Sequence, residues 1–404
     1  METQEVSFPQ IVEVGCGIDV HQAVIVATIR RSDQSYETRT FEAYTSSLKE
    51  LRDWCRQKGV THIAMESTGV YWKPVYNILE EFFEVILVNA RHVKNIPGHK
   101  TDKKDSAWLS KLLLGGLLKG SFIPPVEIRD LRDIVRYKKK QVQQVSSESN
   151  RQYRILEDAN IKLGTVMQVG SLSAKKIIAD LLEGVKDPVL LAKRVHGKTK
   201  ASKTEIIKAL EGNFREHHRF MMKAIQQSIE AKEKLIKELD AQIDLMVQKY
   251  SVEIDLLTTI DGVGRDSAIA IISEIGTDMS RFPNEHHLSS LGGMSPGNNE
   301  SAGKKKSSKT IKGNQHLRAS LTECGWGATR KKDGFLKRKY YSIAARRGKK
   351  KALFAVGHKI LVASYFILRN LEPYKEPADR SKEMKQKQIE SLKRRILDLE
   401  SSIA

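Results

Sequence analysis

The sequence has few cysteines and no long apolar run. Its three cysteines, Cys16, Cys55 and Cys324, stand far apart, and without a Cys-x-x-Cys pair they predict neither a zinc ribbon nor a disulfide framework. The longest apolar runs, such as residues 269–272, fall far short of a membrane span. Residues 1–10 are polar and acidic, unlike a signal peptide. We therefore expect a protein of a reducing compartment, the cytoplasm, with no place in a membrane.

Acidic residues are scarce in one part of the chain. Lys and Arg outnumber Asp and Glu by 69 to 49 over the whole sequence, which favours a polyanionic partner such as nucleic acid. Most of the excess lies in residues 304–359, where 18 Lys or Arg accompany only Glu323 and Asp333. Aromatic and apolar side chains are interleaved there. We interpret this block as a folded phosphate-binding surface, the alternative being a solvated basic tail.

The first part of the chain, residues 10–126, has the pattern of an α/β domain. Strand patterns occur in residues 10–31 (two strands joined by a turn), 36–44, 61–66 and 84–89. Apolar residues have helical spacing in residues 46–58, 70–83 and 102–119. Strands followed by alternating helix and strand predict a mixed sheet with helices on its faces.

The rest of the chain is expected to be mainly helical. Residues 127–252 are expected to form a helical, coiled-coil region, because residues 127–160 and 214–250 lack strand patterning. From Ile225 to Tyr250 apolar residues, with Lys232 as the one polar position, recur in alternating steps of four and three. That pattern predicts an antiparallel or intermolecular coiled coil, or a single amphipathic helix packed on its own domain. Residues 253–372 are expected to form a second globular domain. Residues 378–404 repeat the heptad pattern, which predicts a separate carboxyl-terminal helix suited to coiled-coil pairing between subunits.

Two glycines flank one apolar residue near the start of this second globular domain. Gly262 and Gly264 lie between helical stretches, as in a helix-hairpin-helix element whose backbone N–H groups face a phosphate. A plain glycine-rich turn accounts for the same residues equally well. Both interpretations stay open at this point.

Four acidic residues in the α/β domain are placed for metal binding. Asp19 and Glu66 each close an apolar strand, where an acid is costly unless charged partners or a metal meet it. Asp102 and Asp105 lie three residues apart at the start of a helix and so share one face. Together, such carboxylates can bind two Mg²⁺ ions, or Mn²⁺, for a phosphodiester displacement. Each acid alone is more often a surface charge or a partner of the helix dipole.

The motifs around these acids resemble a known family. Gly-Ile-Asp-Val, Met-Glu-Ser-Thr-Gly-Val-Tyr-Trp and Lys-Thr-Asp-Lys-Lys-Asp, in that order, are similar to the amino-terminal motifs of the DEDD transposases of the insertion-sequence one-ten family. Residues 261–264, 291–304 and 312–318 are similar to that family's transposase domain. The resemblance implies a RuvC-like, RNase H-type fold for the first domain and a coiled-coil linker to the second.

The resemblance also implies roles for individual residues and partners. The four metal-binding acids of the family are matched by Asp19, Glu66, Asp102 and Asp105. Ser301 matches a serine nucleophile that joins covalently to DNA. The family is further understood to use a noncoding RNA from its own element to choose donor and target DNA.

Ser301 is less distinctive when only its own surroundings are considered. A free hydroxyl needs a base or a metal to deprotonate it, and no histidine is adjacent in sequence. Activation by the acids' metal ions requires the two domains to assemble. The residues alone do not distinguish Ser301 from Ser307, Ser308 or an ordinary loop serine. Ala302 also departs from the Ser-Gly pair that is frequent in the family.

Several residues of the second domain are candidates for contacts with nucleic acid, although solvated lysines are as common. These candidates are Gly262, Gly264, Lys304, Lys305, Lys306, Lys312 and Arg318.

Together these features predict a Mg²⁺-dependent, serine-using DNA recombinase that moves its own insertion sequence as a dimer or tetramer. Three alternatives stay open. The first is an invertase of the same lineage, and the second is a RuvC-like junction endonuclease in which Ser301 is idle. The third is a non-enzymatic nucleic-acid-binding scaffold.

Overall fold

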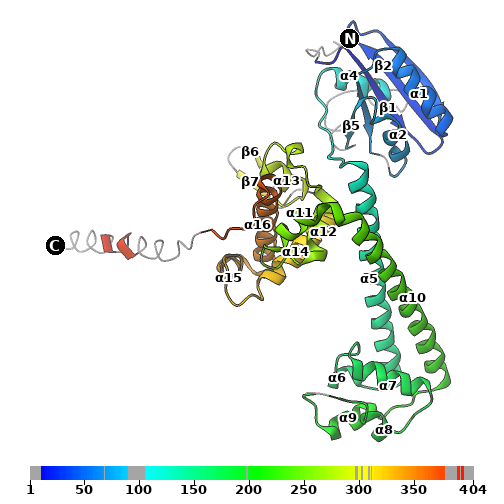
Figure 1. Ribbon diagram of the computed structural model, residues 1–404, viewed down its shortest axis with the longest axis vertical. Coiled ribbons are helices and arrows are strands. Elements are labelled where there is room, and N and C mark those ends of the chain that lie inside the picture. The colour runs from blue at the N-terminus through cyan, green and yellow to red at the C-terminus, as the bar shows by residue number, and fades with distance from the viewer. Residues whose placement is uncertain are drawn as a thin grey trace. The chain divides into compact units, whose positions relative to one another are not determined.

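The computed structural model forms two compact units, Met1–Ile123 and Pro124–Ala404 (Figure 1). The structure describes residues 11–67, 69–89, 105–196, 199–295, 299–301, 304–307, 310, 312–377, 389–391 and 393–394. Most of the predicted carboxyl-terminal helix over residues 378–404 lies outside the described residues, as do Asp102 and Ser308.

Unit 1 contains a five-stranded mixed sheet, which confirms the prediction of an α/β fold. The strands are β1 (Val14–Val20), β2 (Val24–Arg31), β3 (Tyr36–Glu42), β4 (His62–Glu66) and β5 (Glu84–Val88). Their order is β3-β2-β1-β4-β5. The first three strands along the chain pair antiparallel, whereas β4 lies parallel to β1 and to β5.

Helices cover both faces of this sheet. Successive side chains of each strand point to opposite faces, so alternate residues contact the helices on either side. Ile18 of β1 and Ile63 of β4 point into a core with Leu51, on the face covered by α1 (Thr45–Gln57) and α2 (Trp72–Leu79). The opposite face of β1 carries Gly15 and Gly17, and there α4 (Asp105–Leu114) lies against the sheet. Thr28 of β2 and Ser106 of α4 share a buried hydrogen bond of 2.8 Å between these two elements.

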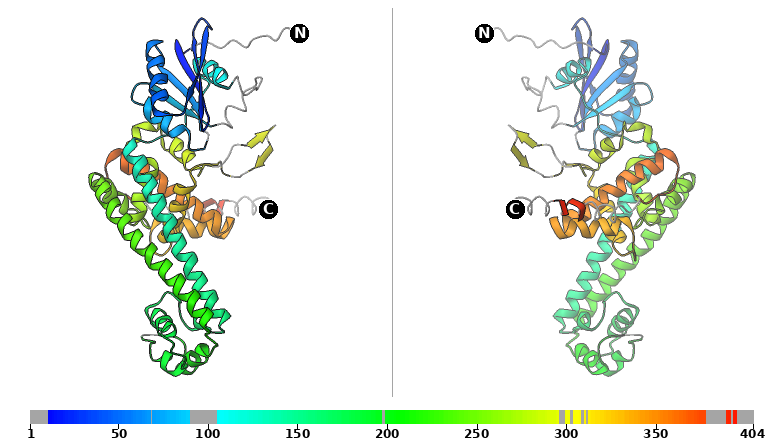
Figure 2. Two further views of the ribbon diagram at one scale, coloured as in Figure 1. Left: turned by 90° about the vertical axis from the view of Figure 1, so that its right-hand side faces the viewer. Right: turned by 90° about the vertical axis from the view of Figure 1, so that its left-hand side faces the viewer.

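Unit 2 begins with two long helices that pack antiparallel (Figures 1 and 2). They are α5 (Val126–Asp158) and α10 (Glu216–Val247). Near one end Lys138 of α5 pairs with Asp240 of α10. Towards the other, Gln152 donates a 2.8 Å hydrogen bond to Gln226. Helix α10 therefore packs against α5 within the chain, and pairing of its predicted seam as a coiled coil stays a prediction.

Four short helices lie between these two long helices in the sequence. They are α6 (Leu163–Val166), α7 (Leu172–Leu182), α8 (Pro188–Ala192) and α9 (Lys203–Leu210). They share a core that includes Leu163, Ile177 and Leu210. Each of the last three begins at a side chain that caps its first backbone N–H groups. The sequence predicts a helical region over residues 127–252 but does not resolve these separate helices.

The remaining residues of unit 2 form a helical assembly around one apolar helix. Its helices are α11 (Ser251–Thr258), α12 (Arg265–Ile275), α13 (Glu285–Leu291), α14 (Gln315–Ala328), α15 (Phe335–Arg347) and α16 (Lys349–Asn370), and short 3-10 turns occur at Gln248–Tyr250 and Met279–Arg281. A two-stranded sheet of β6 (Asn299–Ser301) and β7 (Lys304–Ser307) interrupts them. No strand was predicted in this domain.

Helix α16 corrects the expectation that every apolar run is short. Among the described helices it alone is long and apolar enough to cross a membrane, and half of its apolar stretch is buried. Ala352, Val356 and Ile360 are enclosed within unit 2. This burial is what a core helix of a helical domain shows, so length and composition are weak indications of a membrane span here.

Gly262 follows α11 in a tight turn that packs against α14. Its φ is +85°, and a methyl group added there would lie 2.3 Å from both Ala328 N and Cys324 O. At Gly264 nothing lies within 4 Å of such a methyl group. Close packing thus accounts for the first glycine, while binding of either glycine to nucleic acid stays a prediction.

These two glycines make a matched pair for a stability test. Gly262→Ala is expected to destabilise unit 2 by about 1–3 kcal/mol, the usual cost of overpacking, because its new atom meets backbone that cannot rotate away. Gly264→Ala should change stability far less. Thermal unfolding of both variants checks this, with a shift of roughly 2–4 °C per kcal/mol in a unit of this size. Equal shifts would contradict the packing argument.

Candidate active site

Two of the candidate acids of unit 1 lie at the carboxyl ends of two neighbouring parallel strands. Ile18 of β1 pairs with Met65 of β4, so Asp19 and Glu66 are the next residues along the two strands. Because Ile18 and Met65 both point into the core, alternation directs Asp19 and Glu66 to the opposite face. That is the face covered by α4.

On this face the backbone of helix α4 packs directly against the backbone of β1 at Gly17. A methyl group added at Gly17 would lie 2.1 Å from Ser106 O and 2.4 Å from Ser110 N. Gly17 is two residues before Asp19 on the same face, and Asp105 directly precedes Ser106. The start of α4 is therefore held next to the strand ends, on the side where both carboxylates point.

The acids share one end of the sheet without forming a finished metal site. Among the described residues, no three Asp, Glu, His or Cys side chains are close enough together to bind a metal ion. Asp102, the fourth predicted acid, lies outside the described residues. The oxygen donors of Asp19, Glu66 and Asp105 are of the type that Mg²⁺ and Mn²⁺ prefer, so the residues present fit such an ion in kind.

A histidine that the sequence analysis overlooked contacts one of these acids. His21 Nε2 lies 3.0 Å from Asp19 Oδ2, and the Asp19 side chain is only 13% exposed whereas that of His21 is largely exposed. His21 comes directly after β1, so the spacing Asp-Val-His was its only signal. A neighbour of this kind can orient a carboxylate toward a metal.

The predicted nucleophile lies on the short ribbon of unit 2. Ser301 is the last residue of β6 and pairs with Lys304, the first residue of β7. Ser307, the alternative serine, pairs with Asn299 at the other end of the ribbon. The two candidate serines therefore occupy different places on the ribbon. Ser301 lies beside the connection between the strands, and Ser307 lies at the base.

The predicted nucleic-acid-binding residues occupy different settings. Lys304, Lys305 and Lys306 belong to β7, and Lys312 is exposed. Arg318 lies on α14, where its Nη2 donates a 2.7 Å hydrogen bond to Gly293 O. Its guanidinium is thus engaged inside the unit, and its binding to nucleic acid stays a prediction.

Comparison with known families now relates the two units to one function. A family model for the DEDD transposases of IS110 elements, described as "Transposase", matches residues 16–161. A second, described as "Transposase IS116/IS110/IS902 family", matches residues 254–342. The chain belongs to the IS110 family of DEDD transposases. A search of curated proteins found no match.

Membership of the IS110 family confirms the resemblance drawn from the sequence motifs. The protein is a DNA transposase, an enzyme that cuts and rejoins DNA strands. The first match contains the candidate acids, and the DEDD type of its domain suggests the use of divalent metal ions. The second match contains Ser301. Residues 162–253, with the four short helices and α10, lie between the two matches.

The tight approach at Gly17 gives a test of how the acids are placed. Gly17→Ala should push α4 from the sheet, and if Asp105 has its predicted role it should reduce DNA cleavage by about tenfold or more, because Asp105 moves with the helix. Gly15→Ala is the matched control, since its methyl group would meet only flexible Leu113 and Leu114 side chains at 2.9 Å. Cleavage assays with thermal unfolding check this. Equal cleavage by the two variants would show that α4 does not set the position of Asp105.

Proposed function

We propose that this transposase moves its own insertion sequence with a carboxylate-bound metal site in unit 1 and Ser301 as the nucleophile. The observation that carries the metal site is the register of β1 and β4, which directs Asp19 and Glu66 to the face where α4 begins. Asp105 and Asp102 are proposed to complete the set. The arrangement supports a RuvC-like domain with two Mg²⁺ ions, or Mn²⁺.

The proposed reaction is a phosphodiester exchange. The Ser301 hydroxyl loses its proton and attacks the scissile phosphorus, so that a Ser–O–P bond forms as the bond to the leaving sugar oxygen breaks. That oxygen takes up a proton, and a sugar hydroxyl of another strand later displaces the serine in the reverse manner. Bound metal ions would supply Lewis-acid stabilisation of the charged oxygens. The acids and Ser301 must reach the same phosphate for this chemistry.

The basic block supports a nucleic-acid surface around the turn between α15 and α16. Gly348 joins these helices, and Arg346, Arg347 and the three lysines 349–351 beside it are all exposed. Trp326 on α14 is 48% exposed, and the Arg330 guanidinium lies 5.9 Å from the centre of its ring. Exposed cations beside an exposed ring suit phosphates and stacked bases.

We propose DNA as the first partner of this surface and a noncoding guide RNA from the element as a further one. The chain is proposed to act in the cytoplasm as a dimer or tetramer. Its membership of a transposase family argues against the scaffold alternative, in which no activity depends on the acids.

Replacement of Ser301 tests the proposed nucleophile directly. Ser301→Ala should abolish the detergent-resistant protein–DNA species formed on a plasmid that carries the gene with its flanking DNA, because no other group would form the ester bond. Ser307→Ala, on the neighbouring strand, is the control and should retain it. Asp19→Asn should lose the same species at every Mg²⁺ concentration, whereas Asp33→Asn, in an exposed turn of the same unit, should not. Recombination by Ser301→Ala at the wild-type rate would favour a water-using endonuclease.

Salt dependence tests the basic surface. Replacing Lys349 and Lys350 with Ala should weaken DNA binding and reduce the slope of log K against log salt by about 1 for each phosphate that is no longer neutralised. Lys234→Ala with Lys237→Ala, on the exposed side of α10, is the charge-matched control. Filter binding at several salt concentrations measures both. Equal slopes for the two double variants would locate the DNA elsewhere.

A further inference from the structure

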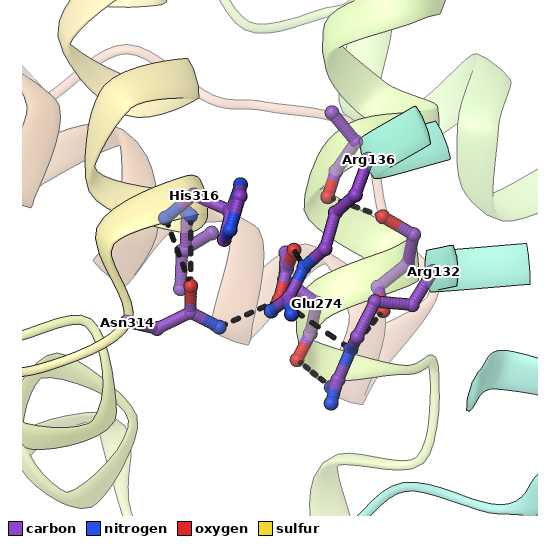
Figure 3. Close-up of polar contacts among 8 residues, drawn as sticks. Arg132, Arg136, Glu274, Asn314 and His316 are labelled. Atoms are coloured by element: carbon purple, nitrogen blue, oxygen red, sulfur yellow. Dashed lines mark hydrogen bonds and ion pairs between the residues drawn. The ribbon is translucent and has the colours of Figure 1, made fainter. Parts of the chain in front are cut away.

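A buried carboxylate joins three helices of unit 2 (Figure 3). Glu274, in the last turn of α12, is only 3% exposed. Arg136 of α5 donates to both of its oxygens, each at 2.7 Å, and Asn314 Nδ2 donates to Oε2 at 2.6 Å. Burial opposes ionisation of Glu274, but the bonds from Arg136 and Asn314 and the charge of Arg132 hold its pKa below the usual value.

Arg132, one turn earlier on α5, reinforces the same junction. Its Nε donates to Ser273 O at 2.9 Å and its Nη2 to Glu274 O at 2.7 Å. These carbonyls belong to the end of α12, where a helix leaves backbone acceptors without internal partners. The first turns of α5 are therefore fixed to α12 through both side-chain and backbone acceptors.

Asn314 extends the network to the segment that carries the serine ribbon. Its Oδ1 accepts hydrogen bonds from His316 N at 3.0 Å and Leu317 N at 3.1 Å and so caps α14. Its own backbone N–H donates to Leu291 O at 2.8 Å. The Asn314 side chain therefore has both ends engaged, one at the start of α14 and the other at Glu274.

The two ends of the ribbon segment touch each other beside Asn314. A methyl group added at Gly313 would lie 2.2 Å from Gly293 N, and Gly293 has a φ of +60°. Arg318 holds the same place through its bond to Gly293 O. Residues 293 and 313 thus close the chain into a loop, and β6 and β7 lie within that loop. The network of Arg136, Glu274 and Asn314 is called the clasp below.

We propose that the clasp positions the serine ribbon, with Arg136, Glu274 and Asn314 acting as positioning residues for Ser301. A two-stranded ribbon is marginally stable by itself, and a nucleophile displaced by about 1 Å can lose about a hundredfold in rate. The base of the ribbon therefore needs an external anchor. A buried ion pair adds little net stability over apolar residues but tolerates few geometries, which suits an anchor. The inference rests on the proposed role of Ser301.

Two variants remove the clasp while sparing the fold. Asn314→Ser keeps a good helix cap for α14 but removes the donor to Glu274. Arg136→Met with Glu274→Met replaces the buried pair by apolar groups. Arg132 loses its 3.4 Å ion pair with the Glu274 carboxylate but keeps its hydrogen bonds to the backbone oxygens of residues 273 and 274. The control is Lys139→Met, which breaks the exposed 3.0 Å pair between Lys139 of α5 and Glu323 of α14. The control thus alters another bridge between α5 and α14 away from the ribbon base.

The experiment uses the full chain and the plasmid with the gene's flanking DNA. Both clasp variants should form the covalent protein–DNA species ten- to a hundredfold more slowly, bind DNA within about twofold of the wild type, and exchange the amide hydrogens of residues 299–307 faster. Lys139→Met should match the wild type in all three measurements. If the clasp only stabilised the fold, the two clasp variants would instead lose folding stability and DNA affinity together.

Other outcomes overturn the inference. A wild-type rate in folded clasp variants, an unchanged exchange of residues 299–307, a parallel decrease of DNA affinity, or an equal defect in Lys139→Met would each do so. Failure of the serine proposal is recognised separately, because then either Ser301→Ala keeps the covalent species or the wild type does not form it. Hydrogen exchange would still report whether the clasp fixes the ribbon.

Discussion

At Gly17, Gly262, Gly293 and Gly313 the main chain of one segment lies against another with no room for a methyl group. Backbone packing of this kind leaves neither side a rotamer with which to adjust. It fixes the start of α4 on the sheet in unit 1. In unit 2 it fixes the turn after α11 on α14 and closes the loop that contains β6 and β7. The candidate chemistry in each unit sits beside one of these close approaches.

The sheet of unit 1 and the strand-end positions of its acids could be read from the sequence because the signal is local. Alternation and β-branched runs mark each strand, so Asp19 and Glu66 could be expected at strand ends. That these two strands are parallel neighbours is seen in the structure. The close packing of α4 against these strands could not be predicted. The need for a glycine at position 17 becomes clear only when the backbone of Ser106 and Ser110 is seen to lie against it. His21 was missed because one exposed histidine after a strand has no pattern of its own.

In unit 2 the local sequence patterns predict single helices but not how distant segments pair. The seam of α10 was predicted, but a heptad pattern does not name its partner, and α5 became the partner through interactions between residues far apart in the chain. The ribbon of β6 and β7 escaped prediction because its lysine-rich residues do not alternate with apolar ones. Arg136 and Glu274 are separated by more than a hundred residues, so nothing near either one indicated the pair.

The antiparallel packing of α5 and α10 limits how this part of the chain can change its length. Lys138 meets Asp240 while Gln152 meets Gln226, so each step forward on one helix is a step backward on the other. An insertion in one helix alone would shift every later pairing out of register. Lengthening can therefore persist only as matched additions to both helices. The four short helices between them share their core with Leu156 of α5 and Met222 of α10, so they can diverge only where contact with both long helices is kept.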